Sequence, residues 1–184
     1  LGTSSGAHLA MLIGMRPHDP RYSALPLTTD GPEVDGVVDA VILCSPVIDP
    51  LGRYHYAKGL RDDCTPPPGI AERVVSMHDQ YWKTEEAMAE AAPARILARG
   101  ERAFLPPVLL LAHAEEDAHP KPDRVEFVRQ YRKAGGKINE NIFEGEGGLL
   151  AGGATKGLSL REPFSRVAKE SLMQMISFVQ EHVR

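Results

Sequence analysis

Cysteine is scarce in this 184-residue sequence, which holds only Cys44 and Cys64. Two cysteines cannot build a disulfide framework and are typical of a reducing compartment, so the sequence predicts a cytoplasmic protein. Long hydrophobic runs are lacking too. The most apolar stretches, 37–43 and 108–112, are far shorter than the ~20 residues that a membrane-spanning helix needs. These two absences argue against a disulfide-stabilised miniprotein and against a membrane span.

An excess of charge of one sign is also missing. The 25 acidic residues barely outnumber the 21 basic ones, which gives a net charge of −4, and no basic block stands out. A surface for nucleic acid or for an anionic membrane is therefore not expected. Hydrophobic residues make up 42% of the chain, which is enough to bury a core. The composition predicts one soluble α/β domain.

Hydrophobic periodicity predicts that helices and strands alternate. Short apolar runs, typical of strands buried on both faces, occur at 37–44, 108–112 and 137–143. Helical patterns occur at 7–15, 70–82, 84–92, 93–99, 123–134 and 163–183, whereas 49–68 is expected to be irregular. This order predicts the α/β class, a parallel sheet with helices on both faces. Three strands make a thin sheet, so we expect an upstream segment or a partner chain to complete it.

The first residues carry the pattern that points most directly to chemistry. Residues 2–6 read Gly-Thr-Ser-Ser-Gly and fit G-x-S-x-G, and a helical pattern begins immediately afterwards. In a sharp strand-to-helix turn, called a nucleophile elbow, this pattern strains the backbone of the serine and exposes its hydroxyl. Ser4 is then the nucleophile, and the backbone N–H of Ser5 donates to an oxyanion. The alternative is a Gly/Ser-rich helix cap without chemistry.

The sequence resembles the esterase/lipase branch of the α/β-hydrolase superfamily along essentially its whole length. Besides residues 2–6, the matching segments are SPVIDP at 45–50, APARIL at 92–97, 106–112 with the acidic loop after it, YRKAGG at 131–136 and FEGE at 143–146. The resemblance implies that 1–184 is the C-terminal part of an α/β-hydrolase-like domain whose N-terminal strands precede this chain. It also implies a helical lid inserted over 52–99, and neither cofactor nor metal.

The resemblance further implies a catalytic acid in the loop after 108–112. That loop reads Ala-His-Ala-Glu-Glu-Asp-Ala-His-Pro over 112–120. Family members carry the acid four residues before a proline, which selects Glu116, and a slip of one residue selects Asp117. Either carboxylate can orient an imidazole. Without the resemblance, this stretch would be interpreted as a solvated acidic turn.

The histidine of the expected triad is the difficulty. In the family it follows the last strand, and the matching phrase places Gly148 at that position. A serine without an adjacent base is a poor nucleophile. His113 and His119 flank the acidic loop, but their spacing fits no ordinary metal-ligand pattern. The other histidines of the predicted elements are assigned to packing or to the surface: His8, His55, His78 and His182.

The leading prediction is a serine hydrolase of the carboxylesterase or lipase type that acts on small or medium acyl esters and needs no cofactor. Its expected site consists of Ser4, Ser5 and Glu116 or Asp117, with Gly148 at the position of the base. The alternative is a non-catalytic relative that has lost its base and binds a ligand or partner. A flavodoxin-like binding domain is less favoured, because no phosphate-cradling loop follows a strand.

Overall fold

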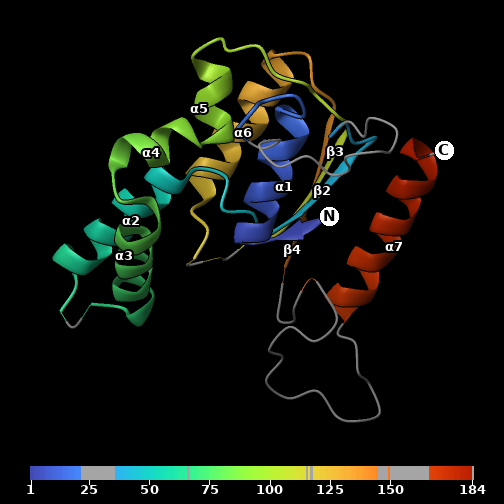
Figure 1. Cartoon of the computed structure of the whole chain (residues 1–184). Coiled ribbons are helices and arrows are strands. Elements are labelled where there is room, and N and C mark those ends of the chain that lie inside the picture. Colours follow the sequence, from blue (N-terminus) through green and yellow to red (C-terminus); the bar gives the residue numbers. More distant parts are fainter. Residues whose placement is uncertain are drawn as a thin grey trace, which may run out of the picture.

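The core of the molecule is a parallel sheet (Figure 1). The computed structural model describes residues 1–21, 36–65, 67–114, 116, 118–144, 149 and 166–183. Four strands lie in the order β1-β2-β3-β4, and every neighbouring pair is parallel. They are Gly2–Thr3 (β1), Val41–Cys44 (β2), Val108–His113 (β3) and Ile138–Phe143 (β4). The predicted α/β class is thus confirmed.

Two strands differ from the sequence expectation by more than one residue. β1 was not predicted, because two residues are too few to show any periodicity. β2 begins at Val41 rather than at Val37, so that only the uninterrupted apolar stretch Val41–Cys44 lies in the sheet. All four of its side chains are buried, as expected for a strand covered on both faces.

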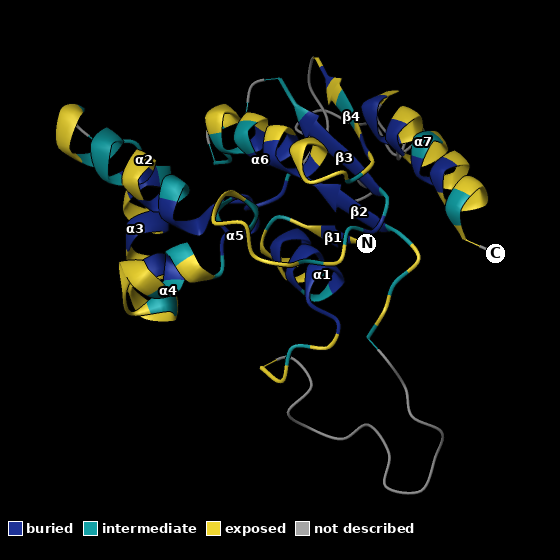
Figure 2. Cartoon of the chain, turned by 90° about the horizontal axis from the view of Figure 1, so that it is seen from above, coloured by how far each residue is buried: buried dark blue, intermediate teal, exposed yellow. Residues whose placement is uncertain are grey.

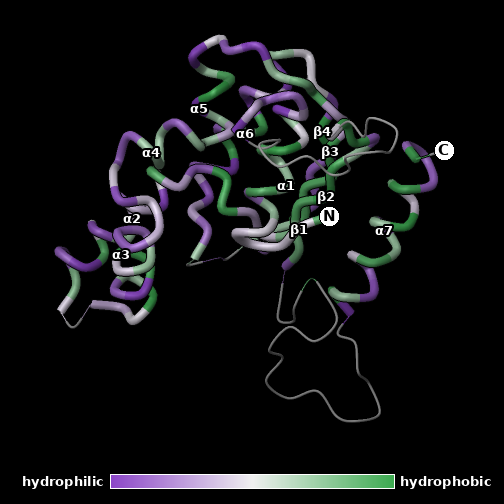
Figure 3. The backbone as a smooth tube through the Cα atoms, in the orientation of Figure 1, coloured by the Kyte–Doolittle hydropathy of each residue, from purple (hydrophilic) through white to green (hydrophobic). Residues whose placement is uncertain are grey.

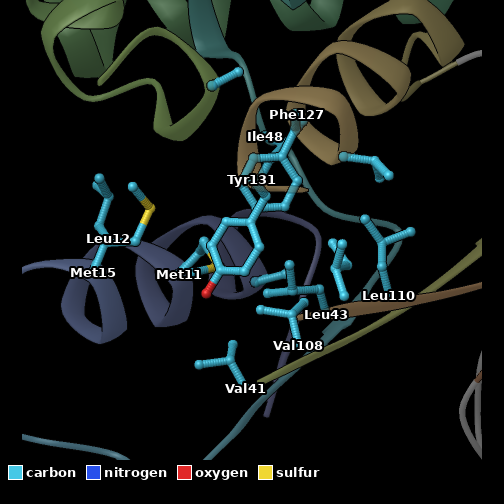
Figure 4. Packing of buried hydrophobic residues seen from close by; sticks show 14 of the residues in the cluster. Met11, Leu12, Met15, Val41, Leu43, Ile48, Val108, Leu110, Phe127 and Tyr131 are labelled. Atoms are coloured by element: carbon cyan, nitrogen blue, oxygen red, sulfur yellow. The ribbon is translucent and has the colours of Figure 1, made fainter. Parts of the chain in front are cut away.

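Helices cover both faces of the sheet (Figure 2). On one face lie Ser5–Met15 (α1), Pro93–Ala98 (α5) and Lys121–Lys133 (α6), and on the other lies Arg166–His182 (α7). Successive strand residues point to opposite faces. Figure 4 shows Val41, Leu43, Val108 and Leu110 packed under α1 and α6, while their neighbours in the sequence, Ile42, Cys44, Leu109 and Leu111, belong to the cluster that includes α7. In Figure 3, β2 and β3 are accordingly almost uniformly hydrophobic.

Three further helices form a separate group beside the sheet (Figure 1). They are Pro50–Asp63 (α2), Gly69–Trp82 (α3) and Glu85–Glu90 (α4), and they share a small core. The expectation that 49–68 is irregular is wrong over α2. The side chain of Asp49 accepts a hydrogen bond from the Gly52 N–H at 2.9 Å, and Pro50 occupies the first turn. This cap and proline are the signals that sequence analysis overlooked.

None of the described helices combines the length and the apolar character needed to cross a membrane. Both cysteines are free thiols: Cys44 is buried in β2 and Cys64 is partly exposed after α2.

Gly2 is required by the close approach of β1 to α1. A methyl group on Gly2 would collide with the carbonyl of Gly6 and lie 2.6 Å from the nitrogen of Ala7, both parts of a rigid turn. A methyl group on Gly6 would meet no described atom within 4 Å. We expect Gly2→Ala to lower the free energy of unfolding by about 2–3 kcal/mol. Gly6→Ala should leave it unchanged or raise it by up to about 1 kcal/mol, because alanine favours helix.

Urea unfolding of the two variants measures this difference. Equal effects of Gly2→Ala and Gly6→Ala would contradict the close strand-to-helix contact.

Candidate active site

Ser4 lies in a strained turn between β1 and α1. Its backbone has φ 50° and ψ −118°, in the left-handed region that residues other than glycine rarely adopt. Its N–H donates to the Cys44 carbonyl at 2.9 Å, which anchors the turn to β2. Its carbonyl accepts from the N–H groups of Ala7 at 3.1 Å and Val47 at 3.2 Å. The strand–turn–helix geometry expected of residues 2–6 is therefore present.

The Ser4 hydroxyl contacts an imidazole. Oγ of Ser4 lies 3.2 Å from Nε2 of His119, which belongs to the loop between β3 and α6. Because β1 and β3 are parallel, their carboxyl ends lie at the same edge of the sheet, and the turn and the loop meet there. The expectation of a serine without an adjacent histidine is wrong. Sequence analysis considered His119 only as a metal ligand, and no spacing in the sequence marks it as the base.

Glu116 lies on the other side of the same imidazole. Its Oε2 is 3.4 Å from Nδ1 of His119, and its Oε1 accepts the backbone N–H of His113 at 2.9 Å. Burial alone would raise the pKa of Glu116. Hydrogen bonds from His119, from the His113 backbone and from Ser45 outweigh that cost, so the pKa lies below its ordinary value. Glu116 is therefore ionised at neutral pH. The Ser4 hydroxyl, the His119 imidazole and the Glu116 carboxylate follow one another in this order.

Ser45 supports this carboxylate and was not singled out by sequence analysis. It follows β2 with φ 44°, and its hydroxyl donates to Oε1 of Glu116. Its N–H donates to the Leu111 carbonyl of β3 at 2.8 Å. A second strained serine is thus held at the same sheet edge as Ser4, where it fixes one oxygen of Glu116 and leaves the other for His119.

Two arginines bind carbonyls in, and immediately before, the loop that carries Glu116 and His119. Nε of Arg53, on α2, donates to the Ala118 carbonyl at 2.6 Å. Nη1 of Arg124, on α6, donates to the His113 carbonyl at 3.2 Å. Both ends of the loop are therefore tied to neighbouring helices.

Ser5 is the first residue of α1, so its backbone N–H has no acceptor within the helix. Ser5 is an exposed residue and directly follows Ser4. The other two residues predicted for the site, Asp117 and Gly148, lie outside the described residues. Within the described ranges, no three His, Cys, Asp or Glu side chains lie close enough to hold a metal ion.

Two cavities adjoin α1. One of about 490 Å³ lies along α1 from Ser5 and Gly6 to Leu12, and residues of α2 and α3 also line it. A larger one, of about 690 Å³, surrounds Met15 and Arg16 at the opposite end. An eleven-residue helix is about 16 Å long, so the larger cavity lies too far from Ser4 to serve it.

No protein-family model and no curated protein sequence matches the chain. Solved structures do resemble it. A variant of the esterase E40 matches all of the chain with a TM-score of 0.63 and 17% identity, and the chain covers 52% of that structure. EstE5, soaked with p-nitrophenyl butyrate, matches 97% of the chain with a TM-score of 0.60 and 18% identity, over 51% of its own length.

A third structure is the esterase Est2 of the planctomycete Thermogutta terrifontis with butyrate bound. It matches 97% of the chain with a TM-score of 0.57 and 22% identity, over 55% of its own length. The chain thus spans about half the length of each of these structures. The parallel sheet, the helices on both of its faces and the strained serine turn, together with these likenesses, show that the chain has the α/β-hydrolase fold of these esterases.

Proposed function

We infer that the chain carries the nucleophile, base and acid of a serine carboxylic ester hydrolase that acts on small or medium acyl esters. The contact between the Ser4 hydroxyl and the His119 imidazole, 3.2 Å long, is the observation that carries this proposal. The shared fold of the esterase structures supports it. In this proposal His119 is the base, whereas the family resemblance implied a histidine at the position that Gly148 occupies.

The proposal gives each group a role that agrees with its position. Nδ1 of His119 carries the proton that faces Glu116, which leaves the lone pair of Nε2 to accept the Ser4 proton. The deprotonated Oγ attacks the carbonyl carbon of the ester, and the carbonyl oxygen becomes an oxyanion. The Ser5 N–H donates to that oxyanion at the positive end of α1.

Breakdown of this intermediate returns the proton. The imidazolium donates it to the leaving alkoxide, which departs as the alcohol and leaves an acyl group on Ser4. A water molecule, deprotonated by His119, then releases the carboxylic acid and restores the hydroxyl. Glu116 stays ionised throughout and stabilises the imidazolium.

Fluorophosphonate labelling tests the proposal. Such a probe phosphonylates an activated serine, so we expect one label, on Ser4, together with hydrolysis of p-nitrophenyl butyrate. Ser4→Ala should remove both. Ser76→Ala, at an exposed serine on α3, should keep both. Labelling that persists in Ser4→Ala would overturn the assignment. A wild-type protein that takes no label and cleaves no ester would favour the non-catalytic, ligand-binding alternative.

A further inference from the structure

The cavity of about 490 Å³ begins one residue after the nucleophile, at Ser5 and Gly6. Its volume is within the range of about 300–1,000 Å³ that is usual for small-molecule sites. Much of its wall is apolar, and the residues responsible are Leu9, Leu12, Val47, Met77, Tyr81 and Trp82. The cavity is therefore placed to hold the part of an ester that extends away from the carbonyl under attack.

One permanently charged side chain, that of Arg53, lines this wall. None of the described lining residues is acidic. Nε of Arg53 donates to the Ala118 carbonyl at 2.6 Å, and no carboxylate among the described residues forms an ion pair with its guanidinium. Burial, reinforced by repulsion from Arg73, lowers the pKa of Arg53, yet a guanidinium stays charged at neutral pH. A half-buried cation in an apolar cavity is stabilised most strongly by an anionic ligand, which replaces the water that burial removed.

Two imidazoles complete the polar part of the wall without adding charge. Burial lowers the pKa of His8 and of His78, so both are neutral at pH 7. Nε2 of His8 lies 2.8 Å from the Ala91 carbonyl, and the His78 ring stacks on Tyr54 with centroids 6.1 Å apart. Within the described lining, the charge of Arg53 is thus not offset by any other group.

Resting on the esterase function inferred above, we propose that the cavity binds a carboxylate carried by the substrate and that Arg53 is the residue that recognises it. The preferred substrates are then small or medium esters whose acyl or alcohol part ends in a carboxylate, such as monoesters of dicarboxylic acids. A planar guanidinium pairs with a carboxylate through two parallel hydrogen bonds. The apolar wall contacts the carbons between the carboxylate and the ester.

Matched esters test this specificity. The neutral reference is p-nitrophenyl hexanoate. Mono-p-nitrophenyl adipate carries a carboxylate on its acyl part, and 4-(hexanoyloxy)benzoate carries one on its alcohol part. We expect Arg53→Gln to lower the ratio of kcat/KM for one charged ester to kcat/KM for the neutral ester by about 10- to 100-fold. The ester that responds identifies which part of the substrate enters the cavity.

Controls separate recognition from positioning. Arg53→Gln also loses the hydrogen bond to Ala118, next to His119, so a purely structural role would lower activity on all three esters equally. An equal loss would overturn the proposal. Arg53→Lys keeps the positive charge and should retain part of the ratio. Arg61→Gln removes an arginine of the same helix that does not line the cavity, and should leave the ratio unchanged.

Binding without turnover separates this proposal from the esterase function. With the Ser4→Ala protein, calorimetry should show adipate binding at least about tenfold more tightly than the uncharged adipamide, and Arg53→Gln should remove that difference. If no ester is hydrolysed but adipate binds in this way, the esterase function fails and the carboxylate site stands. Equal binding of adipate and adipamide overturns the carboxylate site, even if p-nitrophenyl hexanoate is hydrolysed.

Discussion

Replacing His119 by glutamine should lower kcat for p-nitrophenyl butyrate about 10⁴-fold or more, because the variant leaves the Ser4 hydroxyl without a proton acceptor. Glutamine keeps much of the size and polarity of the imidazole, so the fold should survive. KM should change far less than kcat, because the imidazole acts on the hydroxyl rather than on the bound ester. Steady-state kinetics and the rate of fluorophosphonate labelling measure the loss.

His113→Gln is the matched control. His113 is the last residue of β3, immediately before the same loop, and it contacts Glu116 through its backbone N–H, which the variant keeps. It should retain activity within about threefold, a typical outcome for a side chain outside the reacting group. A loss below tenfold in His119→Gln would show that the base comes from elsewhere, and Gly148→His would then be the variant to examine for a gain.

The second large effect is expected from Glu116→Gln, which should lower kcat about 10³- to 10⁴-fold. An amide at this position cannot stabilise the imidazolium and no longer favours the tautomer that leaves Nε2 free to accept a proton. The two contacts to Oε1, from Ser45 and from the His113 N–H, should still hold the side chain in place. Thermal unfolding of the variant checks that the fold is kept.

Asp117→Asn decides between the two acids that the sequence left open. With Glu116 facing His119 at 3.4 Å, Asp117→Asn should keep activity within about threefold. If Asp117→Asn carries the large loss and Glu116→Gln does not, the register of the acidic loop has been misassigned. If neither variant loses activity, the loop is structural only.

The centre of the sheet was predictable because β2 and β3 are buried on both faces. Their unbroken apolar runs, Val41–Cys44 and 108–112, meet one requirement, burial, which the order of residues alone reveals. β1 was not predictable, because two residues pair with β2 only once the whole sheet exists. α2 was predictable from the Asp49–Pro50 cap but was overlooked, since its polar, glycine-containing sequence shows a weak apolar stripe.

The site was predictable to a different degree for each residue. Ser4 and Ser5 follow from local geometry, since a sharp strand-to-helix turn needs small residues in a fixed pattern. Glu116 depended on a family resemblance. His119 was missed because its role depends on which loops meet at one edge of the sheet, a long-range property that the spacing of residues 116–119 does not reveal. Ser45 was missed for the same reason, because its partner lies 71 positions away in the sequence.

Because Glu116 and His119 are close in the sequence, little chain entropy is lost when they are brought together. The cost of closing a loop grows with the logarithm of its length, and these two residues are separated by a single turn in which the His119 N–H donates to the Glu116 carbonyl. The contact between them thus adds little to the conformational entropy that is lost when the loop after β3 becomes ordered. The separation of 115 positions between Ser4 and His119 is bridged by the pairing of β1 with β2 and of β2 with β3. The entropic cost of joining nucleophile to base is therefore already met by the formation of the sheet.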